Sequence, residues 1–140
     1  MRKLGIDYGD ARVGIAITDA LNITVQGLET IHHQGNDKVV LKRLEELLKQ
    51  YEIDTFVIGM PINMNGTKTE RVEVTEKFIH KCKCRFPKIA IETIDERLTT
   101  VAAHKTMNFL NVNKNKKRNI VDTISAVYIL ETYMKKCENS

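Results

Sequence analysis

Cysteine is scarce in this sequence, and its spacing suits neither disulfides nor zinc. The 140 residues include only three cysteines, Cys82, Cys84 and Cys137, which are too few for a disulfide framework. Cys82 and Cys84 lack a second cysteine or histidine pair at zinc-binding spacing, and the four histidines fall on different expected elements. The sequence therefore predicts free thiols and assigns no histidine a role.

Long apolar runs are also missing. Charged residues interrupt every apolar stretch well short of the roughly 18 residues that a membrane span needs. Asp7 stands where a signal peptide would have its apolar segment. With 42% hydrophobic and 29% charged residues, the composition is that of an ordinary globular domain that needs no disulfide or structural metal. We expect one domain over residues 1–140, with a cytoplasmic location and no membrane contact.

Basic residues are present but unevenly distributed. The formal net charge is +4, and residues 100–119 contain five basic residues and no acidic one. This leaves 17 basic and 18 acidic residues elsewhere, so the positive excess is local. The basic residues of the segment are Lys105, Lys114, Lys116, Lys117 and Arg118. Such a loop suits a polyanion, although a solvated loop without a ligand would have the same composition.

The order of expected elements indicates an α/β fold. Residues 3–8, 13–18 and 24–31 read as three strands whose short connections favour antiparallel pairing. Apolar residues then recur every three or four positions over 37–51, which predicts an amphipathic helix capped by Asn36 or Asp37. The remaining expected elements are a buried strand at 55–59, a helix around 72–82, a strand at 88–94 and helices at 98–109 and 120–134. This order specifies a mixed sheet with helices packed on its faces.

Asp7 is the first of three acidic positions that need an explanation. It ends a strand of apolar residues, where the loss of solvation would be costly without a partner. Gly9 and Gly14 follow and would let the backbone approach a ligand closely. The alternative is an ordinary hairpin turn without chemistry.

Asp95 and Glu96 form the second position, after a later strand. Arg97, Thr99 and Thr100 follow at once and offer a cation and hydroxyl groups that could hold a phosphate. In the alternative reading, one of the threonines caps the next helix and the acids complement its positive end.

Asp122 is the third position and lies in an apolar helical segment. The residues three, four and seven positions later are Ser125, Ala126 and Ile129, so Asp122 shares a face with small and apolar side chains. The alternative is a capping arrangement with Asn119 as the cap and Asp122 three residues later.

Three carboxylates brought together would repel one another unless a divalent cation neutralised them. Oxygen ligands favour Mg²⁺ or Mn²⁺, which can activate water and hold a phosphate. Two such ions about 4 Å apart could clamp the attacking and leaving oxygens of a phosphodiester. The basic segment immediately before Asp122 would bring a polyanion to this site.

The whole chain resembles the YqgF/RuvX family of RNase H-like nucleases, described as Holliday junction resolvases and as nucleases that mature the small-subunit ribosomal RNA precursor. The resemblance rests on four ordered motifs: Ile6-Asp7-Tyr8-Gly9 with Arg12-Val13-Gly14; Gly59-Met60-Pro61 with Met64-Asn65-Gly66-Thr67; Asp95-Glu96-Arg97-Leu98-Thr99-Thr100; and Val121-Asp122 with Ser125-Ala126 and Ile129-Leu130. It implies an RNase H-like fold, with a five-stranded mixed sheet whose first three strands are antiparallel and helices on both faces. Asn65 stands where the family has Asp, which touches a loop and leaves the acidic positions intact.

The resemblance also implies a site. Asp7, Asp122 and one acid of the Asp95-Glu96 pair would bind Mg²⁺ or Mn²⁺, and strand alternation sends the two side chains of that pair to opposite faces. We favour Glu96, with Asp95 as the alternate. Nucleic acid would contact Arg12, Arg97, Thr99, Lys114, Lys116, Lys117 and Arg118.

The sequence thus predicts metal-dependent hydrolysis of phosphodiester bonds in structured nucleic acid, with a metal-activated water attacking in line. The main alternative is a non-catalytic RNase H-like module that binds nucleic acid or acts as a scaffold. An actin-like ATPase or sugar kinase is a weaker rival. Those enzymes enclose nucleotide between two such domains, and 140 residues provide only one. Branched DNA and precursor ribosomal RNA both remain open as substrates, as do the number of metal ions and the general base. Junction cleavage would favour a homodimer, whereas RNA trimming would suit a monomer.

Overall fold

Five strands form a single mixed sheet in the computed structural model, which describes residues 1–61, 70–95 and 114–138, with side chains from residue 123 onward in the last segment. The strands are β1 (Arg2–Tyr8), β2 (Arg12–Thr18), β3 (Val25–His32), β4 (Ile53–Met60) and β5 (Ala90–Asp95), in the spatial order β3-β2-β1-β4-β5. β1 pairs antiparallel with β2, and β2 with β3, whereas β4 runs parallel to β1 and to β5. The expected mixed sheet with three antiparallel strands at its start is confirmed.

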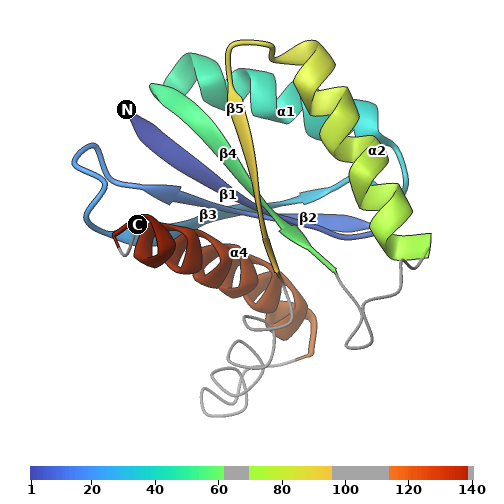
Figure 1. Ribbon diagram of the computed structural model, residues 1–140. Helices are drawn as coiled ribbons and strands as arrows, with labels where there is room; N and C mark the ends of the chain where they lie inside the picture. The colour runs from blue at the N-terminus through green and yellow to red at the C-terminus, as the bar shows by residue number, and fades with distance from the viewer. Residues whose placement is uncertain (62–69, 96–113, 139–140) are drawn as a thin grey trace.

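Helices cover both faces of this sheet (Figure 1). Strand alternation divides β1 between them: Leu4 and Ile6 belong to a core on the side of α1 (Asp37–Gln50) and α2 (Glu70–Arg85). On the other face, Ala126, Ile129 and Leu130 of α4 (Lys114–Glu138) pack with Ala16, Val57 and Ile94. The continuous apolar run of β4 follows from this arrangement, because a central strand is buried on both faces.

Helix α1 begins where the sequence predicts. The side chain of Asn36 accepts a hydrogen bond from the backbone N–H of Lys38, so Asn36 is the N-cap. Arg43 then joins α1 to β3 through two hydrogen bonds to the Glu29 carboxylate, of 2.8 and 2.7 Å. This bidentate pair fixes α1 along the edge strand.

Helix α4 differs from the sequence prediction at its start. It begins at Lys114, six residues before the expected start at residue 120, so Lys114, Lys116, Lys117 and Arg118 lie in its first turns and not in a loop. The capping interpretation of Asp122 is wrong for the same reason: Asn119 lies inside the helix, and Asp122 is beyond its first turn.

The helix expected at residues 98–109 and the loop with Asn65 lie outside the described residues. Among the helices that are described, none combines the length and the apolar character needed to cross a bilayer.

Candidate functional site

The carboxyl ends of β1, β4 and β5 meet at one edge of the sheet, because these three strands are parallel. Asp7 is the penultimate residue of β1 and is partly buried. Asp95 ends β5, where it pairs with Met60 of β4. Ligands of open α/β sheets bind at this kind of edge. The structure therefore brings the first two acidic positions to the same edge, two strands apart.

Asp7 and Asp95 nevertheless lie on opposite faces of the sheet. Asp7 shares the face of Gly5, against which α4 packs. On β5, Ile94 belongs to the core beneath α4, so Asp95 lies on the face of α1 and α2. Because of this opposite orientation, Asp95 is poorly placed to bind the same metal ion as Asp7.

Helix α4 lies very close to β1. A Cβ atom added to Gly5 would lie 2.7 Å from the carbonyl oxygen of Ala126, so only glycine permits this approach. Residue 122 precedes Ala126 by one turn on the same side of the helix. The C-terminal end of α4 lies on the same side of the molecule as the N-terminus of β1, so the two elements run in roughly opposite directions (Figure 1). The backbone at Asp122 is therefore displaced from Gly5 toward the edge that carries Asp7.

The turn after Asp7 is tight, as the sequence predicts. The backbone N–H of Gly9 donates to the carbonyl oxygen of Arg12 at 2.9 Å. A Cβ atom at Gly9 would lie 2.6 Å from that oxygen, which accounts for glycine at this position. Arg12 opens β2 directly beyond the turn and is partly buried, so its backbone lies at the edge that carries Asp7.

Tyr8 anchors the end of β1 to the opposite face. Its hydroxyl donates to the Asp37 carboxylate at 2.5 Å, and its ring stacks on Phe78 with centroids 4.3 Å apart. Burial and the hydrogen bond to Asp37 raise the pKa of Tyr8 well above its ordinary value, so the hydroxyl stays protonated. The backbone next to Asp7 is thereby held by a buried side chain.

Arg71 is a cation at this edge that sequence reasoning missed. It projects from the first turns of α2, donates to the carbonyl oxygen of Tyr8 at 3.1 Å and lies 3.6 Å from the Asp10 carboxylate. No motif surrounds Arg71, and only the packing of α2 against the sheet brings it to the turn.

The remaining predicted site residues lie outside what the structure describes in full. Glu96, Arg97 and Thr99 are outside the described residues. Asp122 and the four basic residues at the start of α4 are placed by their backbone alone. Among the described side chains, no three His, Cys, Asp or Glu residues lie close enough to hold a metal ion, and two of the three proposed ligands are not among those side chains.

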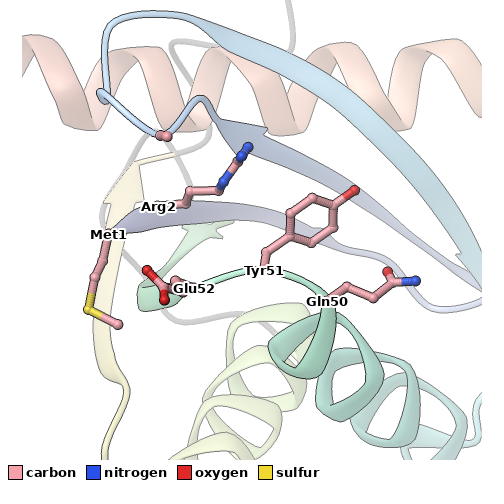
Figure 2. Close-up of a pocket in the computed structure, with 6 residues that line it drawn as sticks. Met1, Arg2, Gln50, Tyr51 and Glu52 are labelled. Atoms are coloured by element: carbon pink, nitrogen blue, oxygen red, sulfur yellow. The ribbon is translucent and has the colours of Figure 1, made fainter.

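A pocket of about 280 Å³ lies at the other end of β1 (Figure 2). Its lining residues are Met1, Arg2, Ala20, Gln50, Tyr51 and Glu52. The Arg2 guanidinium lies 5.2 Å from the centre of the Tyr51 ring and also donates to the carbonyl oxygen of Thr18 at 3.3 Å. Its cation is thus already engaged within the protein, and the pocket is remote from Asp7.

Solved structures define the class of fold. RuvC from Thermus thermophilus, in a complex with a Holliday junction substrate, matches with a TM-score of 0.59 and 11% identity, over 98% of this chain and 96% of RuvC. The Holliday junction resolvase of fowlpox virus matches with a TM-score of 0.58 and 12% identity, over 98% of this chain and 99% of the viral chain. The fold is thus RNase H-like, as the resemblance implied.

Sequence comparison gives the family. Residues 1–136 match the RuvX family, described as Holliday junction resolvase. A relative from Ruminiclostridium cellulolyticum, named "Putative pre-16S rRNA nuclease", is 51% identical over 97% of this chain and 95% of its own length. A relative of the same name from Acetivibrio thermocellus is 49% identical over 96% of this chain and 95% of its own length. The chain belongs to the RuvX family.

Proposed function

We propose that this chain is a metal-dependent nuclease that hydrolyses phosphodiester bonds in structured nucleic acid. Its substrate would be the 5′ end of the precursor of 16S ribosomal RNA, a Holliday junction, or both. The observation that carries the proposal is the position of Asp7, at the carboxyl edge of the parallel strands and on the face covered by α4. The names of the relatives favour ribosomal RNA, and the family description favours the junction.

We assign the metal ligands to Asp7, Glu96 and Asp122. Asp95 lies on the opposite face from Asp7, which favours Glu96 of the adjacent pair. Residue 122 is one turn from the contact between α4 and β1 and lies beyond the first turn of its helix, so it does not occupy a capping position. Three carboxylates form a hard oxygen donor set that fits Mg²⁺ or Mn²⁺. Such an ion, when bound, would activate water and stabilise charge on the phosphate.

Phosphate binding is assigned to Arg12, Arg97 and Thr99 beside the carboxylates, and to Lys114, Lys116, Lys117 and Arg118 at the start of α4. The position of these four basic residues supports this assignment. The amino end of a helix is positive and favours anions, yet the first turn of α4 contains no acidic residue. A bound phosphate backbone would compensate this concentration of positive charge.

A nucleic-acid-binding scaffold without catalysis is the second candidate, because fold and family membership do not guarantee turnover. The location we propose is the cytoplasm, where either substrate would be met. A Holliday junction has two-fold symmetry. If the substrate is a junction, the proposal therefore also implies a homodimer, whereas RNA trimming does not.

Cleavage of end-labelled substrates tests the proposal. A four-way DNA junction and precursor 16S ribosomal RNA are incubated side by side with Mg²⁺, Mn²⁺ or a chelator. Asp7→Asn should still bind both substrates but lose metal-dependent cleavage by a factor on the order of 100 or more. Asp54→Asn is the matched control, since Asp54 lies near the start of β4, at the other end of the sheet, and pairs with Lys3.

Metal-dependent cleavage that is lost in Asp7→Asn and retained in Asp54→Asn would support the nuclease. The preferred substrate would then decide between ribosomal RNA and the Holliday junction. Binding without cleavage under every condition would overturn the nuclease in favour of the scaffold.

A further inference from the structure

A buried histidine joins the turn after Asp7 to the start of α1. His33 follows β3 directly and is only 4% exposed. Its backbone N–H donates to the carbonyl oxygen of Ala11 at 2.9 Å, and the next residue, Gln34, donates to the same oxygen at 3.2 Å. The connection between β3 and α1 is thus bonded to the turn between β1 and β2.

The imidazole ring adds a second bridge between these segments. The backbone N–H of Gly35 donates to Nδ1 at 3.1 Å, so Nδ1 carries no proton. Nε2 therefore carries the proton and donates to the carbonyl oxygen of Gly9 at 2.8 Å. Gln34 and Gly35 have φ angles of 48° and 86°, and these left-handed conformations turn the chain back onto the ring.

The ring itself is packed against the residue next to Asp7. It stacks on the Tyr8 ring with centroids 5.6 Å apart and planes inclined by 19°. Tyr8 is held in turn by Phe78 and by the Asp37 carboxylate. The imidazole therefore cannot move away from Gly9 without disturbing Tyr8.

From these contacts we infer that His33 is a positioning residue for the metal site, in which it fixes the backbone between Asp7 and Arg12. The inference rests on the proposed function, since it assigns both residues to the site. His33 holds the Gly9 carbonyl, two residues after Asp7 and three before Arg12, and a shift of this turn would move both side chains. Residues that orient metal ligands from outside typically contribute about 10- to 100-fold to metal affinity.

Two substitutions separate the bridge to Gly9 from the bridge to Gly35. In His33→Gln, the side-chain amide nitrogen can reach the place of Nε2 and donate to Gly9. In His33→Asn, the shorter side chain can present its oxygen in place of Nδ1 and accept from Gly35, but it cannot reach Gly9. Both variants lose the stacking on Tyr8, so each serves as the stability control of the other.

Mn²⁺ titration of the intact protein by calorimetry is the first measurement. His33→Asn should raise the Kd for Mn²⁺ by roughly 10-fold, whereas His33→Gln should stay close to wild type. In cleavage assays, the Mn²⁺ concentration needed for half-maximal rate should rise in His33→Asn and stay close to wild type in His33→Gln. Equal Mn²⁺ affinities in two variants of similar melting temperature would overturn the inference.

Hydrogen exchange at the Gly9 amide, measured by NMR without metal, is the second measurement. This amide is bonded to the Arg12 carbonyl, so its exchange reports on the turn directly. Faster exchange in His33→Asn than in His33→Gln would support positioning of the turn, and equal exchange would overturn it. A wild-type protein that neither binds Mn²⁺ nor cleaves would overturn the proposed function, while the exchange measurement would still decide the role of His33.

Discussion

The Cα of Gly5 lies so close to the carbonyl oxygen of Ala126 that an added Cβ would be only 2.7 Å from it, and 3.0 Å from the Cβ of Leu130. This contact sets the distance between α4 and β1. Since Asp122 lies one turn before Ala126, the same contact determines how far the backbone at Asp122 is from the end of β1.

Gly5→Ala should therefore separate α4 from the sheet. We expect a loss of about 1–3 kcal/mol in the free energy of unfolding, because the colliding atom is backbone and cannot rotate away. Gly27→Ala is the matched control, since the atoms nearest to its added Cβ belong to the Thr123 side chain, the closest at 3.2 Å, and not to the backbone. Urea denaturation of both variants checks the difference. Equal losses would show that the contact at Gly5 does not limit the approach of α4.

Asp122→Asn should fold like wild type and lose cleavage by a factor on the order of 100. The helix dipole acts most strongly in the first turn of a helix. Since α4 begins at Lys114, residue 122 lies beyond that turn. Glu131→Gln is the control on the exposed side of the same helix. Thermal denaturation and cleavage assays are compared for the two variants. Unfolding of Asp122→Asn alone would indicate a structural carboxylate.

Replacing Lys116, Lys117 and Arg118 together by Ala should weaken nucleic-acid binding and reduce its dependence on salt. Three lost phosphate contacts would lower the slope of log K against log salt concentration by about 2 to 3. The control is the triple replacement of Lys38, Lys42 and Lys49 by Ala, which removes the same charge from the exposed side of α1. Binding titrations at several salt concentrations give both slopes. Identical slopes in the two triple variants would remove the start of α4 from the interface.

Cys82 should make the protein less stable at alkaline pH. Burial, with a contribution from the Asp37 charge, raises the pKa of the Cys82 thiol to about 12. The folded state therefore favours the neutral thiol. Its contribution to stability is complete below the pKa of the unfolded chain, about 8.5, and declines as the pH rises toward 12.

The decline should reach about 1.4 kcal/mol per pH unit and should be absent in Cys82→Ala. Urea denaturation in the presence of a reductant, at several pH values between 8 and 11, measures it. Cys84→Ala, on the exposed side of the same helix, should keep the wild-type slope. If the dependence of the unfolding free energy on pH were unchanged in Cys82→Ala, other groups would be the cause of the lower stability at alkaline pH.

Most of the sheet could be predicted because its strands are marked locally. The three-residue turn between β1 and β2 and the apolar runs of β1, β2 and β4 are properties of neighbouring residues. The start of α4 was misplaced because Lys114, Lys116, Lys117 and Arg118 resemble a solvated loop, and no apolar period distinguishes them from one.

The contacts around the candidate site could not be predicted in the same way. His33 reaches the turn after Asp7 from the segment that follows β3, and Arg71 reaches it from α2, and neither lies in a motif. Sequence reasoning gave the histidines no role, since an isolated histidine shows no metal-binding spacing.

The sequence by itself determined the family and the order of the described strands and helices, and it pointed to Asp7, Asp122 and one acid of the Asp95-Glu96 pair as candidate ligands, because periodicity and motifs depend on residues close together in the chain. Only the tertiary structure decided that Asp95 faces away from Asp7, that α4 contacts β1 at Gly5, and that His33 bonds to Gly9. These relationships depend on the register of strands that pair over long sequence separations, and on helices packed across them. They therefore depend on the packing of the whole core and not on any single segment of the sequence.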